Sequence, residues 1–291
     1  MMHRWLVTGA AGMVGTDLRD ALQSRADAVI PVTKSELDIT DGEAVRELVY
    51  AKQPTIIVNC AAYTRVDDAE AHEAAANAVN GAGVESLAQA ANDINALLVH
   101  ISTDFVFDGS QRTPYEENAP TNPLSAYGRS KLLGEQAAAR ADRHLIIRTA
   151  WLFGVHGPNF VEAMRNQVKK GTNPLRVVND QRGRPTYTPH LATAIVRLSL
   201  LASESEHARG IVHYADEPEV TWFGFACAIV ASLGERTFDQ IAVEPVTSAE
   251  FPRPAKRPAY SVLSTERYTR LTGAEPESWR EGLQEYLTLR T

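Results

Sequence analysis

Residues 4–15 read RWLVTGAAGMVG, a short apolar run that leads directly into three glycines. Arg4–Thr8 has the composition of a buried strand, and the following segment is predicted to be a helix. Gly9, Gly12 and Gly15 have the spacing G-x-x-G-x-x-G rather than the G-x-G-x-x-G of the general dinucleotide fingerprint. The physical requirements are the same: a tight turn, close approach of phosphate to backbone N–H groups, and close packing of helix on strand. At the first strand and helix of the chain, these glycines favour a dinucleotide site over an ordinary β-to-α turn.

The rest of the first half alternates short apolar runs with longer Ala-rich stretches. Strands are predicted at 28–33, 55–59, 97–101 and 144–149, and helices at 12–24, from a capping box with Thr40 as N-cap to about Pro54, at 68–92 with a break near Gly81 and Gly83, and at 126–140. The strands are continuously apolar, which is typical of parallel strands covered by helices on both faces. Repeated βα units with right-handed crossovers predict an α/β fold with a doubly wound, Rossmann-type parallel sheet.

Past residue 150 the pattern loosens, and prolines and arginines become frequent, as in GRPTYTP and FPRPAKRP. Helices are predicted at 188–203, at 222–233 and from Ser278 to about Leu289, and a strand at 210–215. We predict that residues 1–154 form a NAD(P)-binding Rossmann domain, to which 189–216 returns. Residues 155–291 are predicted to form a smaller C-terminal substrate-binding lobe on the carboxyl edge of the sheet.

Composition and charge exclude several classes of protein. The chain has 291 residues, 44% hydrophobic and 22% charged, and a formal net charge of −7, which are ordinary values for a globular protein with a sizeable core. The acidic balance argues against general nucleic-acid binding, which uses a basic face. Two cysteines, Cys60 and Cys227, fit a reducing compartment. Because the sequence shows neither a signal-peptide h-region nor about 18–20 consecutive apolar residues, we expect a cytoplasmic protein without a membrane span.

The expected acid about 20 residues after the glycines, which would hold the ribose 2′-hydroxyl, is missing. The predicted second strand ends at Thr33-Lys34, and the nearest acids, Glu36 and Asp38, come later. Lys34 suits a 2′-phosphate, so this position favours NADP(H), with NADH left open.

Tyr127 and Lys131 lie four residues apart on a predicted helix and therefore share one face. The ordinary pKa of tyrosine is about 10, and bringing it near neutrality takes roughly 4 kcal/mol of preferential stabilisation of the phenolate. A nearby ammonium and an oxidised nicotinamide supply part of this. Such a tyrosine donates a proton to a carbonyl oxygen as hydride reaches the carbon. A hydroxyl in Ser102-Thr103-Asp104, beyond the end of a strand, is placed to bind the same oxygen.

The chain resembles the dTDP-4-dehydrorhamnose reductase family of the extended short-chain dehydrogenase/reductase superfamily over nearly its whole length. The segments that carry the resemblance are WLVTGAAGMVG, LDIT, NCAAYTRVDDAE, ISTDFVFDG, AYGRSKLLGE, RTAWLFG, NDQRGRPTYT and RPAYSVL. ISTDFVFDG and DQRGRPT are not general superfamily motifs. The resemblance implies reduction of the C4 ketone of dTDP-4-dehydro-L-rhamnose to dTDP-L-rhamnose by NADPH, with NADH as an alternative.

The resemblance also implies roles for individual residues. Thr103 would polarise the sugar C4 oxygen, Tyr127 would protonate it, and Lys131 would hold the nicotinamide ribose and lower the tyrosine pKa. Together with Lys34, the residues expected to bind the cofactor are Gly9, Gly12, Met13, Val14, Gly15, Asp38, Ile39, Ala61, Ala62, Tyr63, Tyr127 and Lys131. Those expected to bind the dTDP-sugar are Val66, Thr103, Asp104, Phe105, Trp151, Asn159 and Arg257.

One position departs from the family pattern: Phe105 stands where members commonly have tyrosine, so a hydroxyl is missing at an expected substrate contact. Some members bind magnesium through acidic residues at a dimer contact. The sequence has no clear matching cluster, and its eight histidines lack metal-ligand spacing, so we predict no metal. By analogy with the superfamily, a homodimer would form through helices beside the Tyr–Lys helix.

Two other functions remain open from the sequence. One is reduction of another NDP-4-keto-6-deoxysugar in a secondary-metabolite pathway, which Phe105 favours. The other is a non-catalytic nucleotide-binding subunit of the kind that regulates methionine adenosyltransferase, against which the intact Thr103, Tyr127 and Lys131 argue.

Arginines of the second half are candidates for the diphosphate, because the guanidinium binds phosphate oxygens in a bidentate manner. Arg257, inside RPAYSVL, is favoured, whereas Arg253 is balanced between this role and a solvated surface. Trp222 and Phe225 are predicted to belong to a core helix face rather than to a base-stacking site.

Overall fold

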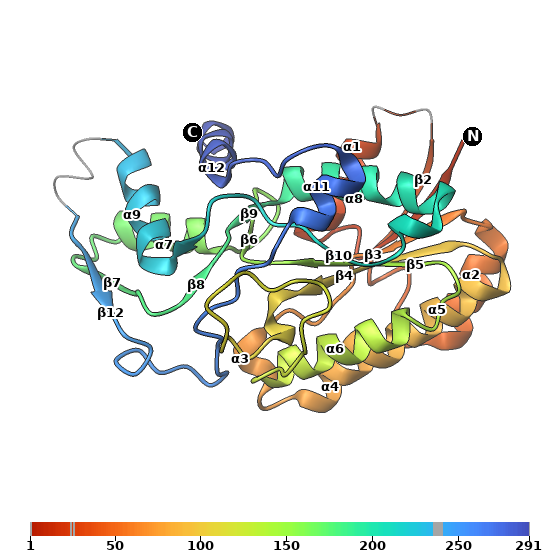
Figure 1. The fold of residues 1–291 in the computed structure, drawn as a ribbon, viewed down its shortest axis with the longest axis horizontal. Helices are drawn as coiled ribbons and strands as arrows, with labels where there is room; N and C mark the ends of the chain where they lie inside the picture. The colour runs from red at the N-terminus through yellow and green to blue at the C-terminus, as the bar shows by residue number, and fades with distance from the viewer. Residues whose placement is uncertain (1, 24, 26, 235–240, 291) are drawn as a thin grey trace.

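The computed structural model describes residues 2–23, 25, 27–234 and 241–290. A six-stranded parallel sheet with the order β10-β5-β4-β3-β1-β2 forms the centre of the larger part (Figure 1). Its strands are β1 (Arg4–Thr8), β2 (Ala28–Val32), β3 (Ile56–Asn59), β4 (Leu97–Thr103), β5 (His144–Thr149) and β10 (Gly210–His213). This order confirms the predicted doubly wound sheet, and all six strands overlap the predicted ones.

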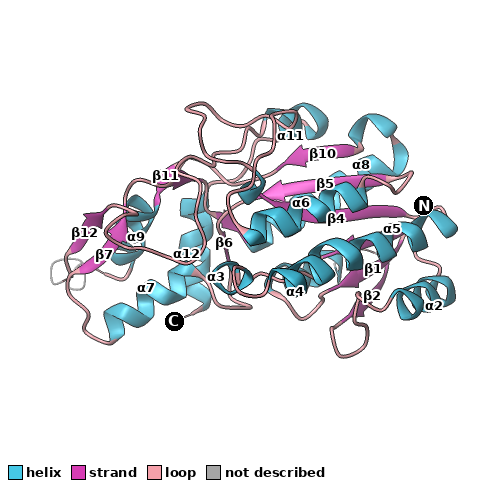
Figure 2. Cartoon of the chain, turned by 90° about the horizontal axis from the view of Figure 1, so that it is seen from below, coloured by secondary structure: helices cyan, strands magenta, loops and turns pink. Residues whose placement is uncertain are grey.

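Helices cover both faces of the sheet (Figures 1 and 2). One face carries α1 (Met13–Gln23) and α8 (Thr188–Glu204), and the other carries α2 (Gly42–Lys52), α5 (Gly83–Asp93) and α6 (Ala126–Ala138). Trp5 and Val7 belong to the core under α1 and α8, whereas Leu6 belongs to the core on the opposite face. Because both faces are buried, successive residues of a strand are all apolar.

The predicted helix at 68–92 is interrupted, as expected near Gly81. It consists of α3 (Val66–Ala69), α4 (Glu73–Asn77), a π-helical turn (Ala78–Ala82) and α5. The predicted cap of α2 was wrong by one residue: Asp41 accepts hydrogen bonds from the first-turn N–H groups. Thr40 does not cap the helix because its hydroxyl donates to Asp38. Ser24, the predicted end of the first helix, lies outside the described residues.

A second, smaller part lies beyond the carboxyl ends of the strands (Figure 1). It contains α7 (Phe160–Lys169), α9 (Trp222–Ser232) and α12 (Trp279–Leu289), with the strand pairs β7 (Leu175–Val178) and β12 (Val243–Val246), β8 (Arg182–Gly183) and β11 (Val220–Thr221), and β6 (Leu152–Phe153) and β9 (Thr186–Tyr187). Its core is built around Phe153, Phe225 and Trp279. Between these elements α8 and β10 return to the sheet, where α11 (Glu266–Thr272) packs on both.

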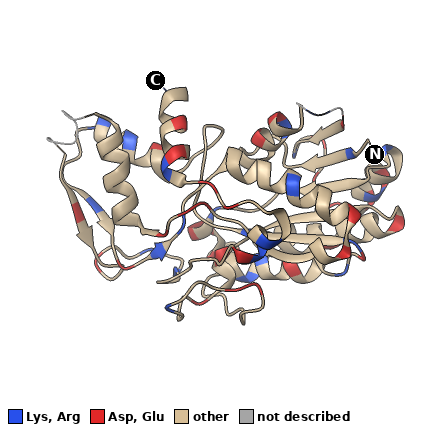
Figure 3. Ribbon diagram, turned by 45° about the horizontal axis from the view of Figure 1, so that its top comes forward, with Lys and Arg blue, Asp and Glu red and all other residues tan. Residues whose placement is uncertain are grey.

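Acidic and basic residues are interspersed over the helices of both parts (Figure 3). Within the described residues, no helix combines the length and the apolar character that crossing a bilayer requires. Cys60 and Cys227 are both partly buried, and both thiols are free.

Candidate active site

The predicted site residues gather where the strand order reverses, between β1 and β3. Gly9 follows β1, Ala61 follows β3, and Thr103 ends β4. Tyr127 lies in the first turn of α6, which begins after Ser125, whose hydroxyl accepts the N–H of Gly128. Ligands of doubly wound sheets bind at such a reversal, beyond the carboxyl ends of the strands.

The glycine turn is packed too closely for side chains. Gly9 has φ +63°, and a Cβ there would lie 2.6 Å from the backbone nitrogen of Ala61. A Cβ on Gly15 would lie 2.3 Å from the carbonyl oxygen of Gly9, and the N–H of Gly12 donates to that oxygen over 2.9 Å. Met13 and Val14 open α1 directly after the turn. The residues present therefore fit a dinucleotide, whose pyrophosphate needs close backbone approach and a helix N-terminus.

The three residues predicted to bind the adenosine end of the cofactor follow β2 and have different environments. Lys34 is exposed, whereas Ile39 is only 4% exposed and packs against Gly83. Asp38 accepts hydrogen bonds from the backbone N–H and hydroxyl of Thr40, which lower its pKa. Lys34 is the one of these three that combines exposure with positive charge.

Asn80, which the sequence analysis did not single out, holds the segment that carries Ala61, Ala62 and Tyr63. Its side chain accepts from the N–H of Tyr63 over 2.8 Å and donates to the carbonyl of the same residue over 3.0 Å. It also donates to the hydroxyl of Ser130 on α6. This fully buried amide lies in the π-helical turn, so the irregular turn connects the cofactor side of the site to the Tyr–Lys helix.

The half-buried phenol of Tyr127 remains protonated at neutral pH. Burial raises the pKa of Tyr127 to about 12, although its hydrogen bond with Thr103 acts in the opposite direction. This pKa is that of the protein without cofactor, in which Lys131 Nζ donates to the Ile101 carbonyl over 2.6 Å. The lowering of the Tyr127 pKa by Lys131 together with an oxidised nicotinamide stays a prediction. A protonated phenol suits a group that gives a proton to a ketone.

The Thr103 hydroxyl forms hydrogen bonds with the next two residues of the chain. It donates to Asp104 over 3.0 Å and accepts the N–H of Phe105 over 3.2 Å. Asp104 is almost fully buried, and this burial raises its pKa to about 6. The ring of Phe105 lies edge-on to Tyr127, with 5.6 Å between centroids.

A cavity of about 570 Å³ lies between this edge and the smaller part of the chain. Among the residues that line it are Phe105, Trp151, Phe160, Trp222, Arg253 and Arg257. Trp151 stacks on Trp222 with ring centroids 3.6 Å apart and planes 7° apart. Trp151 has a φ of +47°, which is unusual for a bulky residue. Trp222 packs against the core of the smaller part, as predicted, and it also lines the cavity, whereas Phe225 is fully buried.

The cavity arginines have different partners. Arg257 forms a bidentate ion pair with Asp67, with 3.0 Å for each N–O contact. Arg253 lies over the ring of Phe251, 4.9 Å from its centroid. No ion pair of Arg253 occurs among the described residues, although its charge helps lower the pKa of Asp67, whereas Arg257 is already engaged by that carboxylate.

Two residues predicted to contact substrate have evident local roles. Asn159 caps α7 by accepting the N–H of Glu162, and its amide donates to the carbonyls of Gly154 and Gly157. Val66 begins α3. These contacts engage the Asn159 amide fully, so its predicted place near a diphosphate would require it to leave the cap.

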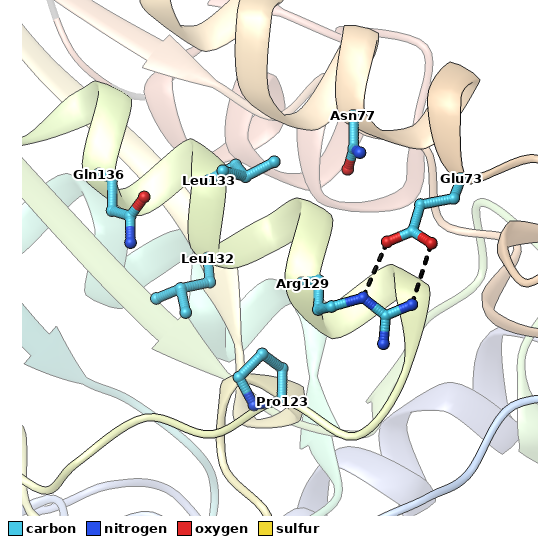
Figure 4. Close-up of a pocket in the computed structure, with 7 residues that line it drawn as sticks. All are labelled: Glu73, Asn77, Pro123, Arg129, Leu132, Leu133 and Gln136. Carbon is cyan, nitrogen blue, oxygen red and sulfur yellow. Dashed lines mark hydrogen bonds and ion pairs between the residues drawn. The ribbon is translucent and has the colours of Figure 1, made fainter.

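A separate hollow of about 300 Å³ lies on the outer surface between α4 and α6 (Figure 4). Figure 4 shows Arg129 directed at Glu73, and the two form hydrogen bonds of 2.8 and 3.0 Å. Leu133 is 43% exposed beside them. This surface includes Arg129, Leu132 and Leu133 of the Tyr–Lys helix and shares no lining residue with the cavity beside Trp151.

One group of potential metal ligands occurs in the described part of the chain. Carboxylate and imidazole atoms of Asp17, Asp20 and His156 lie within 4.8 Å of one another. Burial raises the pKa of Asp17, whose Oδ1 is 3.5 Å from His156 Nε2. Exposed acidic groups are common without an ion, and the absence of a catalytic metal stays a prediction.

Comparisons with known proteins agree with this geometry. The family model described as the RmlD substrate binding domain matches residues 2–291. A dTDP-4-dehydrorhamnose reductase of Streptomyces griseus is 44% identical, with 97% of this chain and 92% of that protein covered. A dTDP-4-keto-6-deoxy-D-glucose reductase of Streptomyces niveus is 43% identical, with 99% and 98% covered. The crystal structure of a dTDP-4-dehydrorhamnose reductase from Bacillus anthracis in complex with NADP superposes with a TM-score of 0.92 at 35% identity, and each chain is fully covered.

Proposed function

The chain belongs to the dTDP-4-dehydrorhamnose reductase family, and we propose that it reduces the C4 ketone of dTDP-4-dehydro-L-rhamnose to dTDP-L-rhamnose with NADPH. The observation that carries this proposal is the position of Tyr127. Its phenol lies beside Thr103 at the switch point of the sheet, and its ring touches Phe105, which lines the large cavity. A ketone at the end of the cavity beside Phe105 would lie next to this proton donor and this hydroxyl.

The chemistry divides between the cofactor and the chain. NADPH, when bound, supplies the hydride that adds to the ketone carbon. Tyr127 donates its proton to the ketone oxygen, and Thr103 orients that oxygen through its hydroxyl. The high pKa of Tyr127 in the free protein keeps the donor loaded at neutral pH. Lys131, buried beneath the phenol on the same helix, would hold the nicotinamide ribose.

The cofactor and the sugar nucleotide would bind at different places in the chain. We assign the cofactor to residues 1–154 with 189–216, through the turn of Gly9, Gly12 and Gly15. The sugar nucleotide would occupy the cavity, where stacked Trp151 and Trp222 offer an apolar wall. A dTDP-sugar combines a flat base, a diphosphate and an apolar C6 methyl group, which suits aromatic walls beside arginines.

A second candidate function is reduction of a related dTDP-4-keto-6-deoxysugar. Two observations favour it: the similarity to the Streptomyces niveus enzyme, and Phe105 at a wall of the cavity where the family commonly has a hydroxyl. The two candidates share every chemical step and differ in the sugar that is reduced.

The deciding experiment follows NADPH absorbance with enzymatically prepared dTDP-4-dehydro-L-rhamnose. We expect turnover in the native chain and loss of at least about 10³-fold in Tyr127→Phe, with NADPH binding retained. Product stereochemistry at C4 and a panel of dTDP-4-keto sugars separate the two candidates. No oxidation of NADPH or NADH with any of these substrates would favour a nucleotide-binding regulatory subunit instead.

A homodimer through the α4–α6 surface is part of the proposal. Leu133 is a large apolar side chain exposed on that surface, next to the Arg129–Glu73 ion pair. Sedimentation of the native chain and of Leu133→Glu tests it, because a buried charge would favour the monomer.

A further inference from the structure

A buried chain of hydrogen bonds runs across three strands and ends at Lys131. The Thr8 hydroxyl on β1 donates to Asn59 Oδ1 over 2.6 Å. Asn59 Nδ2, at the end of β3, lies 3.2 Å from His100 Nδ1 on β4. His100 Nε2 lies 3.3 Å from Lys131 Nζ on α6. All four side chains are at most 2% exposed, so water cannot take the place of a partner.

The chain determines which way the Asn59 amide faces. Asn59 Oδ1 accepts both the Thr8 hydroxyl and the N–H of Ala61, the latter over 3.2 Å. Turning the amide over would direct an NH₂ group at the Ala61 N–H, leaving two buried donors opposed. Asn59 Nδ2 therefore faces His100, and it can only donate.

The orientation of Asn59 in turn selects the tautomer of His100. Burial keeps the pKa of His100 well below its usual value, so the ring is neutral and carries one proton. Because His100 Nδ1 must accept from Asn59, that proton lies on Nε2. The Nε2–H group then points at Lys131 Nζ.

An N–H group beside Lys131 favours one of its two charge states. The ammonium has three donors and no acceptor, whereas the neutral amine has a lone pair that can accept from His100 Nε2–H. One Lys131 proton is already used by the Ile101 carbonyl.

Glu135 and Cys60 act to raise the pKa of Lys131, but burial outweighs them and lowers it from its usual value. Glu135, one turn along α6, is bound by Nε and Nη2 of Arg148 from β5 and by the Ser102 hydroxyl from β4. Cys60, after β3, keeps its proton because burial raises the pKa of its thiol to about 12. Tyr127, on the same helix, is likewise a neutral phenol. Among the described residues, no carboxylate forms an ion pair with Lys131, and burial lowers its pKa to about 8.

We propose that His100, oriented by Asn59, is a positioning residue that stabilises the neutral amine of Lys131, so that the ionisation of Lys131 depends on a His100 tautomer selected by hydrogen bonds from β3 and β1. The effect on turnover rests on the proposed function, because it assumes that the ammonium of Lys131 serves the Tyr127 site. The ionisation itself is a property of the chain and needs no substrate.

Two NMR measurements on the full-length, cofactor-free protein test this. Long-range ¹H–¹⁵N correlation of ¹⁵N-histidine protein, with His100 assigned by its loss in His100→Gln, should show Nε2 protonated and Nδ1 unprotonated. Titration of [ε-¹³C]lysine protein, with Lys131 assigned by its loss in Lys131→Met, should show a midpoint near pH 8 in the native chain. In His100→Gln an amide oxygen can face Lys131, so the midpoint should rise by about one unit or more.

Asn59→Asp is the second variant, because it keeps the acceptor for Thr8 and Ala61 but replaces Nδ2 by an oxygen. His100 should then carry its proton on Nδ1, and Nε2 should accept from the Lys131 ammonium, which raises the Lys131 midpoint. The matched control is His213→Gln, which alters another fully buried histidine, on β10 and bonded to Tyr115 and Arg148. It should leave the Lys131 midpoint unchanged.

A native His100 protonated on Nδ1 would overturn the proposal without any variant. So would a Lys131 midpoint that stays in place in both His100→Gln and Asn59→Asp. With substrate, kcat/KM for NADPH reports free-enzyme ionisations. Between pH 7 and pH 9 it should fall about tenfold in the native chain, as expected for a group of pKa about 8, and by less in His100→Gln. A protein that meets the NMR predictions but oxidises no NADPH would contradict the proposed function and leave the Lys131 inference intact.

Discussion

The hydroxyl of Thr103 donates to the carboxylate of Asp104, its neighbour in the chain, over 3.0 Å. A threonine that is to donate to a ketone therefore has its proton directed elsewhere in the free protein. The second carboxylate oxygen of Asp104 is buried without a hydrogen-bond partner in the described residues. Burial at the end of β4 raises the pKa of this carboxyl, although hydrogen bonds from Ser261 and Thr103 act in the opposite direction, directly beside the candidate catalytic hydroxyl.

Asp104→Asn should stabilise the protein at neutral pH while lowering turnover. Burial raises the pKa of Asp104 from 3.8 to about 6, so the folded chain holds this proton more tightly than the unfolded chain. The contribution of Asp104 to stability is therefore fully present below about pH 4 and is lost as pH rises through about 6. Removing the charge should raise the free energy of unfolding at pH 7.5 by on the order of 2–3 kcal/mol, and by little at pH 4.

Urea denaturation at the two pH values measures this difference. Asp108→Asn is the control of opposite sign, because hydrogen bonds from Ser110 lower the pKa of Asp108 to about 2. Its loss should destabilise the protein at pH 7.5. An equal effect of Asp104→Asn at both pH values would mean that the charge at this position costs nothing.

Gly183→Ala should weaken binding of the sugar nucleotide. A Cβ on Gly183 would lie 2.5 Å from Cε2 of Trp151, whose other side is stacked on Trp222. The indole must move, so one wall of the cavity is lost. Aromatic pairs contribute about 0.5–1.5 kcal/mol, so KM for the sugar nucleotide should rise about three- to tenfold with little change in KM for NADPH.

Gly42→Ala, on α2, is the matched glycine control, since a Cβ there meets only the side chain of Ser86. An unchanged KM in Gly183→Ala would show that Trp151 does not contact the substrate.

The sheet could be predicted because its signals are local. All four residues of Ile56–Asn59 are buried, and a continuous apolar run with glycine turns around it has few other interpretations. The cap of α2 was misplaced because Thr40 and Asp41 are both good capping residues, and Asp38 competes for the Thr40 hydroxyl. The short strands of the smaller part carry two to four residues each, too few for a period to be visible.

The sequence could predict which residues form the site but not the hydrogen bonds between them. Spacing alone places Tyr127 and Lys131 on one helix face. It cannot show that Lys131 Nζ contacts Ile101 and His100, which both lie on β4. Trp222 was assigned to the core because its helix is apolar. Its stacking on Trp151 joins residues far apart in sequence and depends on how β6 and α9 pack.

Arg253→Ala should weaken binding of the sugar nucleotide. Arg253 lines the cavity and lies over the ring of Phe251, whereas Arg257 forms a bidentate ion pair with Asp67. Hydrogen bonds to charged groups contribute about 1.5–3 kcal/mol, so KM for the sugar nucleotide should rise about 10- to 100-fold.

The salt dependence of KM should also become shallower in Arg253→Ala. Arg182→Ala removes an arginine that is paired with Glu219 at 2.9 Å, and it should leave KM within about twofold. If Arg257→Ala alone raised KM, the diphosphate would instead displace Asp67 from Arg257.

Lys34→Ala should reduce the preference for NADPH over NADH. The end of β2 is tied to the glycine turn, because the N–H of Ala10 donates to the carbonyl of Val32 over 3.1 Å. Glu36 is occupied by the backbone N–H and hydroxyl of Thr33, so its carboxylate closes the turn instead of facing a ribose. Lys34 is then the exposed cation beside the expected 2′-phosphate, and losing it should lower kcat/KM for NADPH about tenfold or more, with NADH unaffected. Lys52→Ala, at the exposed end of α2, should change neither value, and an equal loss with both coenzymes would place the 2′-phosphate away from this turn.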